Sequence, residues 1–515
     1  MKTLASFLFF VAILPVWAAP DPITTPVLVN GTPDVNSQTA ATTTPSPSVS
    51  PETTSLPNRS VEGYWYEAVN TQGLVGRFSL LLEKNGEGIT EAFLDDIDNG
   101  KYHQRLGRAA IKEGQMNIKA PSGNFELNLS PDGNVLAGKE KIGKRAIKLH
   151  FKRGMNFAAP RVDIDGNAVT EYTYQIPQTL DDGWPVGDLL KSDMDVPLVE
   201  KGVGEILNGH FPHFQGLVVV HNDRLLVDEY FQGFGPENLH ELRSDSKSVL
   251  SLLFGIAQDR GLVGLDQKLY DFYPEYRDKA GWAENKNYIT LRYLLTMSSG
   301  FDCADLVPPF YSCLHEMIGS RDWLESVLSQ PLSHQPGAYF AYCSSCLIPL
   351  GDILRKTSNL SVPAFAQKYL FDPLQITHGY WLKGPHGVVE AEGADQLRPR
   401  DMAKLGYLCL KKGKWNGQQI VSEEWVSEST AVQTPKTKKN ARWGYGYLWW
   451  IREISFHHRK IKLIYADGRG GQYIFIVPDL NLVCVTTAGN YLDKDRALAK
   501  LSFDFFETYI LGAVK

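Results

Sequence analysis

Residues 61–155 show alternation of apolar and polar side chains. Phe78 and Leu80 fall on one face of an extended chain, with a polar residue between them. Residues 115–119 and 125–129 alternate in the same way, and Asn-Gly or Asp-Gly pairs recur between the segments. Short strands with turns about ten residues apart predict a β-rich module, built as a barrel or a sandwich.

A different pattern follows residues 156–195, which form a connection rich in Pro and Asp. Two apolar runs, 217–220 and 225–231, are separated by a short polar turn and predict a hairpin. From residue 244 to about 440 the apolar spacing is helical. We therefore expect one larger domain over residues 196–515.

Strand patterns resume near the end of the chain. The expected strands are 443–451, 461–466, 472–477 and 482–487, and an amphipathic helix covers about 494–511. Early and late strands are expected in one antiparallel sheet flanked by terminal helices, with a large helical insertion between them. This α+β arrangement places the active site in the cleft between the sheet and the insertion.

The first 18 residues are predicted to be a signal peptide. Lys2 supplies a positive charge, residues 4–14 are apolar, and Val16-Trp17-Ala18 fits cleavage after Ala18. About 14 apolar residues fall short of the ~20 that span a bilayer, which disfavours an uncleaved membrane anchor. Residues 19–60 are rich in Ser, Thr and Pro and are expected to be a disordered linker. The protein is therefore expected to be secreted, extracellular or periplasmic, without stable membrane insertion.

Composition narrows the possible partners. The chain is 43% hydrophobic and 21% charged, as is usual for a soluble globular protein. A net charge of -6 gives no reason to expect nucleic-acid binding. Nothing in the sequence sets the oligomeric state. Four Asn-x-Ser/Thr sequons, a weak pattern, would carry N-glycans in an exported protein; they begin at Asn30, Asn58, Asn128 and Asn359.

The cysteines are clustered. Four of the six lie in one stretch: Cys303, Cys313, Cys343 and Cys346. Export permits disulfides, and four cysteines allow three pairings, among which the sequence does not choose. The Cys343-x-x-Cys346 spacing also fits a redox or zinc motif, but the second Cys or His pair of such a zinc site is missing. We therefore expect no metal and no cofactor. The other two cysteines, Cys409 and Cys484, sit in apolar runs and are expected to be buried thiols.

Candidate chemistry begins at Ser244 and Lys247, three residues apart just before the apolar run 249–257. A helix places positions i and i+3 on one face, and its first turn has free N–H groups and a positive dipole end. A hydroxyl beside an amine at such a position predicts a serine nucleophile with a lysine base. Lys247 accepts the serine proton only in its neutral form.

Several segments around this pair resemble one known superfamily. They are Arg243–Ser248, with the Ser-x-x-Lys motif, the turn 261–266, the segment 294–301 (LLTMSSGF) and the helix start 400–406. Together they resemble the serine β-lactamase and penicillin-binding-protein superfamily in its class C-like branch. That branch includes D,D-peptidases, esterases and 6-aminohexanoate-dimer hydrolases. The resemblance implies a β-lactamase/transpeptidase-like fold over most of residues 200–515.

The second motif of this branch is Tyr-x-Asn or Tyr-x-Ser, and here it reads Tyr342-Cys343-Ser344. The resemblance implies that Tyr342 shares proton transfer with Lys247. Ser344 stands where β-lactamases have an asparagine that binds the substrate amide, so we expect Ser344 to be a substrate-binding residue. This departure argues against efficient β-lactam turnover.

The third motif is usually Lys-Thr-Gly or His-x-Gly, and here residues 465–472 read YADGRGGQ. This form is most similar to the 6-aminohexanoate-dimer hydrolase and esterase group. The resemblance implies an oxyanion hole built from the N–H groups of Ser244 and Gly468. The lysine that usually anchors the carboxylate of β-lactam and D-Ala-D-Ala substrates is missing, and Arg469 is a candidate substitute. We therefore expect Asp467 and Arg469 to be substrate-binding residues of a site that departs from the family pattern. The glycines have a second interpretation, as close backbone packing and a tight turn.

The β-rich module 61–155 opens with Gly63-Tyr64-Trp65 and resembles a small lipocalin-like module that accompanies some secreted serine hydrolases. We expect an accessory role there; the alternative is lipid or glycan binding. For the whole chain, the sequence predicts a secreted serine hydrolase that cleaves a small-molecule or short-peptide amide or ester. The alternatives are a D,D-peptidase or D-aminopeptidase, and a catalytically inactive binder of cell-wall-like or lipid ligands.

Overall fold

The computed structural model describes residues 61–515, apart from short gaps at 72–73, 97–100, 113, 122, 143–144, 155–158, 162–167, 280–281, 382–383, 390–392, 394, 435–442 and 492–496. The predicted signal peptide and linker lie outside the described residues. The chain folds as two units, one holding most of residues 61–154 and the other most of residues 155–515. Among the described residues, no helix combines the length and the hydropathy needed to cross a bilayer.

The first unit is a closed barrel of eight strands in sequential order. Its strands are β1 Gly63–Thr71, β2 Leu74–Lys84, β3 Thr90–Asp96, β4 Lys101–Lys112, β5 Gln115–Lys119, β6 Asn124–Leu129, β7 Val135–Ile142 and β8 Arg145–Arg153. The alternation along β5 is clear, since Met116 and Ile118 are buried and their neighbours are exposed. Gly138 permits close pairing of β7 with β6, because a Cβ there would lie 1.9 Å from the Glu126 carbonyl oxygen.

The second unit is built on a seven-stranded sheet in the order β10-β9-β19-β18-β17-β16-β15, antiparallel throughout. Its strands are β9 Phe214–His221, β10 Arg224–Tyr230, β15 Trp443–Tyr445, β16 Trp450–Phe456, β17 Arg459–Gly468, β18 Gln472–Val477 and β19 Leu482–Ala488. The early hairpin meets the late strands where Val219 lies opposite Cys484. The prediction of one sheet built from both ends of the domain is confirmed.

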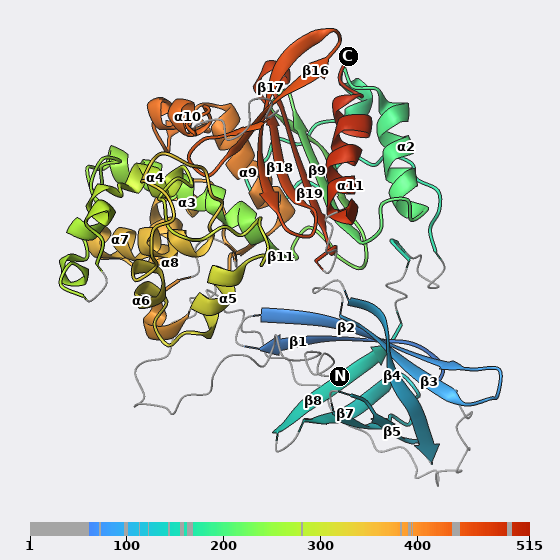
Figure 1. Ribbon diagram of the computed structural model, residues 1–515. Helices are drawn as coiled ribbons and strands as arrows, with labels where there is room; N and C mark the ends of the chain where they lie inside the picture. The colour runs from blue at the N-terminus through green and yellow to red at the C-terminus, as the bar shows by residue number, and fades with distance from the viewer. Residues whose placement is uncertain are drawn as a thin grey trace, which may run out of the picture. The chain divides into compact units, whose positions relative to one another are not determined.

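Helices cover both faces of this sheet. They are α2 Val196–Leu207, α3 Ser246–Asp259, α4 Leu291–Leu295, α5 Ser312–Gly319, α6 Trp323–Leu328, α7 Ile348–Ser358, α8 Val362–Ala366, α9 Pro399–Leu410, α10 Glu423–Ser429 and α11 Ala497–Phe505. Helices α2 and α11 lie on one side, and α9 with the helical insertion lies on the other (Figure 1). Two short strand pairs, β11 His240–Glu241 with β12 Gln396–Leu397 and β13 Lys414–Trp415 with β14 Gln418–Gln419, complete the unit.

The two faces carry separate cores because side chains alternate along each strand. In β9, Val218 and Val220 join the core shared with α3 and α9. Leu217 and Val219, which alternate with them along the strand, join the core under α2 and α11. The central strands β9, β18 and β19 are therefore buried at every position, which is why their sequence shows apolar runs rather than alternation.

The predicted single strand at 443–451 is wrong. The chain forms a hairpin there, with Tyr445 of β15 opposite Trp450 of β16. The turn between them has Leu448 in the left-handed region, at φ 63°. Gly446 is required because a Cβ would lie 1.9 Å from the Ser429 carbonyl oxygen. The continuous aromatic run hid this turn, since a left-handed leucine gives no turn signal in sequence.

The Pro- and Asp-rich connection also contributes to the core of the second unit. Asp182 is buried and accepts hydrogen bonds from the Arg400 guanidinium on α9, at 2.6 and 3.1 Å. Asp228 on β10 accepts a third, at 2.8 Å. Arg400 has no exposed surface. This buried network fastens the connection and α9 to the sheet.

Candidate active site

Ser244 lies in a short 3-10 turn, Arg243–Asp245, that leads directly into α3. The preceding residue, Arg243, adopts a left-handed backbone conformation at φ 50°. Its guanidinium pairs with Glu241 at 2.5 Å and lies 4.7 Å above the ring of Tyr491. These contacts hold a conformation that costs a non-glycine residue about 1 kcal/mol or more. The turn Arg243–Asp245, here called the nucleophile turn, is thus held in place by the contacts that Arg243 makes with Glu241 and Tyr491.

Lys247 is the second residue of α3 and is 1% exposed. Its Nζ donates a hydrogen bond to Ser244 Oγ at 3.1 Å. The pair predicted from sequence is therefore in direct contact. An amine enclosed by protein beside a hydroxyl is the geometry required for proton transfer between the two groups.

Tyr342 completes the constellation from the chain between α6 and α7. It is buried, and its hydroxyl forms a hydrogen bond with Ser244. Lys247 Nζ is 5.4 Å from the centre of its ring. Burial raises the pKa of Tyr342 well above its ordinary value, and Tyr445 and the Asp467 charge raise it further, against the lowering effect of the Ser244 hydrogen bond. Tyr342 is therefore a neutral phenol that can donate a proton.

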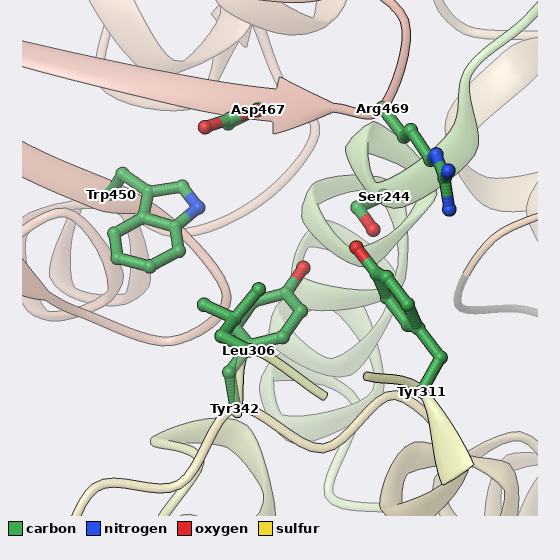
Figure 2. Close-up of a pocket in the computed structure, with 7 residues that line it drawn as sticks. All are labelled: Ser244, Leu306, Tyr311, Tyr342, Trp450, Asp467 and Arg469. Atoms are coloured by element: carbon green, nitrogen blue, oxygen red, sulfur yellow. The ribbon is translucent and has the colours of Figure 1, made fainter. Parts of the chain in front are cut away.

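These groups open onto a pocket (Figure 2). Its lining consists of Ser244, Leu306, Tyr311, Tyr342, Trp450, Asp467 and Arg469. In Figure 2 the hydroxyl groups of Tyr311 and Tyr342 point toward Ser244, and Asp467 projects from β17 above them. Four residues predicted from three separate motifs thus meet in one pocket. The Arg469 side chain is exposed, and its Nε donates to the Tyr491 carbonyl at 3.0 Å.

Gly468 ends β17 and lies against the nucleophile turn. A Cβ at this position would fall 2.3 Å from the Leu242 carbonyl oxygen and 3.2 Å from Asp245 Oδ1. Only glycine allows this approach, so the packing interpretation of the glycine holds and also brings the third motif to Ser244. The role of the Gly468 N–H in an oxyanion hole stays a prediction. Gly470 and Gly471, at φ 100° and 104°, form the tight turn into β18.

Asp245 was not singled out from sequence, although it lies within the Ser-x-x-Lys motif. It has no exposed surface, and among the described residues its carboxylate oxygens have no hydrogen-bond partner. Burial raises the pKa of Asp245 well above its ordinary value; the Asp467 charge adds to this and Lys247 opposes it. The raised pKa favours the protonated, neutral form of Asp245 at the start of α3.

Ser344 is buried and does not line the pocket. Its backbone N–H donates to Asp305 Oδ2 at 2.6 Å, and the Asp305 N–H donates to the Tyr342 carbonyl at 2.7 Å. Burial raises the pKa of Asp305, which the hydrogen bonds from Ser344 and the charge of Lys247 oppose. Asp305 therefore braces the second motif. No motif or periodicity marked it in the sequence.

Three lining residues were also missed or only partly anticipated. Leu306 and Tyr311 lie in an irregular segment before α5, which gives no periodic signal. Trp450 belongs to the aromatic run 443–450, from which one or two cleft-lining rings were expected. Its ring stacks on Tyr342 with centroids 5.7 Å apart. Aromatic and apolar groups thus form much of the pocket wall.

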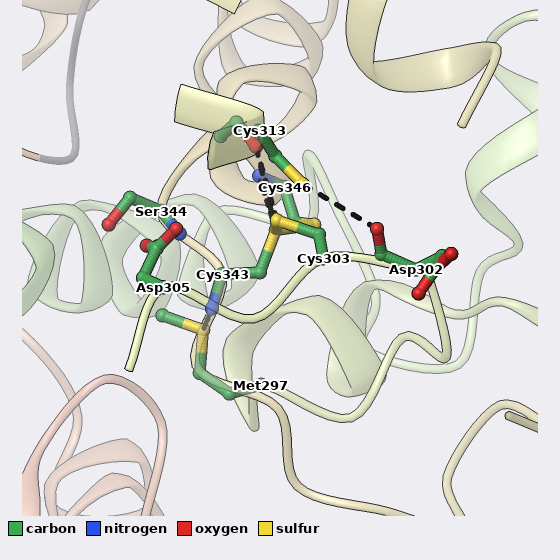
Figure 3. Close-up of a disulfide and its surroundings, with 9 residues drawn as sticks. Met297, Asp302, Cys303, Asp305, Cys313, Cys343, Ser344 and Cys346 are labelled. Atoms are coloured by element: carbon green, nitrogen blue, oxygen red, sulfur yellow. Dashed lines mark hydrogen bonds between the residues drawn. A yellow bond between two sulfur atoms is a disulfide. The ribbon is translucent and has the colours of Figure 1, made fainter. Parts of the chain in front are cut away.

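The cysteine cluster includes Cys343 of the second motif, and Figure 3 shows it with Cys303, Cys313 and Cys346. Cys343 lies within disulfide-bonding distance of both Cys303 and Cys346, and Cys313 is a free, buried thiol. The sequence left the pairing of the four cysteines open, and in the structure Cys313 donates to the Asp302 carbonyl at 3.5 Å. Three sulfurs within 4.8 Å of one another also form a group able to hold a metal, which the sequence did not predict. Within the described residues this group supplies three ligands, one fewer than a structural zinc site requires.

The two remaining cysteines are buried thiols, as expected. Cys409 lies on α9 and Cys484 on β19. Burial raises the pKa of Cys409 to about 12 and raises that of Cys484 as well. Both are therefore packing residues of the two cores.

Comparison with known proteins finds an esterase and a hydrolase among the relatives of this chain. The chain is 26% identical over 220 residues to lovastatin esterase of Penicillium rubens, covering 40% of this chain and 54% of that protein. It is 23% identical over 223 residues to 6-aminohexanoate-dimer hydrolase of Paenarthrobacter ureafaciens, covering 42% and 56%. The chain thus spans about half the length of these curated relatives, and less of some others.

Among solved structures, a protein of Bacillus anthracis assigned as a 6-aminohexanoate-dimer hydrolase superposes with a TM-score of 0.52. The match covers 66% of this chain and 89% of that one at 17% identity, and it shows a shared fold. The model of the beta-lactamase family matches residues 209–501, which is more than half of the 515 residues. The chain belongs to the beta-lactamase family.

Proposed function

We propose that the protein is a serine hydrolase that cleaves an ester or amide through a covalent acyl-Ser244 intermediate. The observation that carries this proposal is the hydrogen bond of Lys247 Nζ to Ser244 Oγ at 3.1 Å, with the Tyr342 phenol bonded to the same serine. Each proton that must move in acyl transfer then has a carrier within the pocket.

In the first half-reaction, neutral Lys247 accepts the Ser244 proton as Oγ bonds to the substrate carbonyl carbon. The carbonyl electrons move to its oxygen, which the N–H groups of Ser244 and Gly468 would stabilise. The bond to the leaving alkoxide or amine then breaks. Tyr342 gives that group a proton and recovers one from Lys247. The products are the acyl-enzyme and a free alcohol or amine.

In the second half-reaction, water attacks the acyl carbon and transfers its proton through the same phenol and amine. Ser244 Oγ leaves with that proton, and the carboxylic acid is released. The stacked Trp450 and the buried Tyr342 hold the relay away from bulk water. This desolvation strengthens the interactions between the charges that form during the reaction.

Asp467 supports a substrate class outside β-lactams. It lines the pocket in a third motif that lacks the family's usual lysine or histidine, and its carboxylate repels the carboxylate group of β-lactams and D-Ala-D-Ala peptides. Two relatives are named an esterase and a dimer hydrolase. We therefore propose ester or amide hydrolysis over β-lactam turnover, with Asp467 and Arg469 contacting the substrate.

We also propose that the protein is exported, from Lys2 and the apolar residues 4–14. Asn128 on β6 and Asn359 after α7 are both exposed, as N-glycosylation of an exported protein requires. The eight-stranded barrel is proposed as a lipocalin-like accessory module. Side chains such as Leu80, Phe125 and Leu127 are buried and pack its interior, which supports an accessory role rather than a catalytic one.

Substrate-class profiling with a matched serine control tests the proposed function. The full chain is compared on p-nitrophenyl esters, nitrocefin and D-Ala peptides, beside Ser244→Ala and Ser251→Ala. Ser251 is a buried serine of the same helix whose hydroxyl has no partner among the described residues. We expect ester cleavage that is lost in Ser244→Ala and kept in Ser251→Ala. Activity retained in Ser244→Ala would rule out this mechanism, and faster nitrocefin than ester turnover would refute the assigned role of Asp467.

A further inference from the structure

Five consecutive apolar residues stand exposed at the rim of the pocket. Residues 306–310, the apolar loop, read Leu-Val-Pro-Pro-Phe, and all five are exposed. Leu306 is 42% exposed, Val307 56% and Phe310 59%. Single exposed apolar side chains are common on protein surfaces, whereas a contiguous run indicates a binding surface.

Both ends of the apolar loop are tied to the catalytic motif. Asp305 precedes it and is bonded through its backbone to Tyr342 and through its carboxylate to Ser344. Tyr311 follows it and donates its N–H to the Asp305 carbonyl at 3.2 Å. Both ends of the loop are therefore held beside Tyr342.

The apolar loop begins at one residue of the pocket and is followed by another. Leu306, the first loop residue, lines the same pocket as Ser244, and so does Tyr311 just after the loop. Figure 2 shows Leu306 beside the Tyr342 ring, with Tyr311 across from it. A chain attached to a carbonyl at Ser244 Oγ would leave the pocket along these residues. An apolar chain would gain by covering them, and a charged one would find no partner on the loop itself.

We propose that the apolar loop is the subsite for an extended apolar chain of the substrate, so that the preferred substrates are lipophilic esters or amides. This inference rests on the proposed function, because it assumes that acyl transfer occurs at Ser244. The position of Leu306 in the pocket lining favours a substrate over a second protein copy or a lipid surface. Burial of each methylene against the loop would raise kcat/KM by up to about fourfold.

The test compares p-nitrophenyl acetate, butyrate, hexanoate and octanoate with the full chain. The variants are Phe310→Ser alone and Val307→Ser combined with Phe310→Ser. Leu190→Ser is the control, because Leu190 is 67% exposed and lies away from the pocket lining. The readout is the ratio of kcat/KM for octanoate to that for acetate, and thermal unfolding verifies that each variant is folded.

We expect the ratio to exceed about tenfold in the parent protein. We expect the double variant to lower it about tenfold, Phe310→Ser to lower it less, and Leu190→Ser to leave it unchanged. A flat chain-length series, or a ratio that the loop variants do not lower, overturns the inference. The inference is also overturned if the same variants instead abolish self-association in sedimentation or binding to phosphatidylcholine vesicles while the ratio stays constant.

The Ser244→Ala variant separates this inference from the proposed function. If acetate hydrolysis depends on Ser244 but chain length has no effect, the proposed function stands and the apolar subsite falls. If no ester is cleaved in a Ser244-dependent manner, the proposed function falls and the subsite with it.

Discussion

Gly468→Ala tests whether the close approach of the third motif to the nucleophile turn is needed for acylation. The added Cβ would lie 2.3 Å from the Leu242 carbonyl oxygen and 2.8 Å from Gln472 Cβ. Atoms do not approach closer than 3.0 Å in such contacts, so the end of β17 and the turn must separate by about 0.7 Å. Because the two proposed oxyanion donors, the N–H groups of Ser244 and Gly468, sit on these two segments, they would separate by a similar distance.

A misplacement of about 1 Å in a reacting site costs about 10²-fold in rate, so we expect acylation to slow by about 10- to 10²-fold. Overpacking of this kind also destabilises a protein by about 1–3 kcal/mol. The assay is the rate constant for labelling by a fluorophosphonate, with thermal unfolding measured in parallel. Gly204→Ala on α2 is the control, because its Cβ meets open space and alanine stabilises a helix by about 0.5–1 kcal/mol. Labelling of folded Gly468→Ala at the parental rate would refute the reasoning.

Three further substitutions test other parts of the site and fold. Lys247→Met should lower the labelling rate by at least about 10²-fold while the fold is kept, because it removes the base; unchanged labelling with a normal melting curve would exclude Lys247 from the chemistry. In Asp245→Asn the pH dependence of stability should change. The fold raises the pKa of Asp245, so this residue contributes fully to the free energy of unfolding at pH values below its pKa in the unfolded chain. That contribution is lost as pH rises through its pKa in the folded protein. The melting temperature of Asp245→Asn should therefore increase relative to that of the parent protein as pH rises from about 4 toward 8. A difference in melting temperature that stays constant over this range would contradict the prediction. Arg400→Met leaves Asp182 and Asp228 buried without their cation, and should lower the free energy of unfolding in urea by about 3–5 kcal/mol. A decrease below about 1 kcal/mol would show that water solvates the two carboxylates in place of Arg400.

The sheet and the reactive pair could be predicted because their signals are local. Runs such as 473–477 are apolar at every position because both faces of the sheet are covered, and Ser244 and Lys247 need only one helical turn to meet. The hairpin at Tyr445 and Trp450 was missed because its turn depends on a left-handed leucine and on packing against Ser429. Neither cause is visible along the sequence.

The rest of the pocket depends on contacts between distant parts of the chain. Asp305, Leu306 and Tyr311 lie on a segment without periodicity, and only the hydrogen bonds to Tyr342 and Ser344 place them in the site. Asp245 lay within a recognised motif, but its role follows from complete burial beside Asp467. Burial of a charged residue is a property of the whole fold, and sequence pattern alone does not supply it.

The central claim is that Ser244 carries the acyl group. The most direct measurement is peptide mapping by mass spectrometry after the full chain is mixed with a slow ester substrate and quenched in acid. The account predicts one acyl group on the peptide that contains Ser244, absent in Ser244→Ala and present in Ser251→Ala. An acyl group on another residue, or product release with no adduct at any quench time under conditions that slow deacylation, would contradict it.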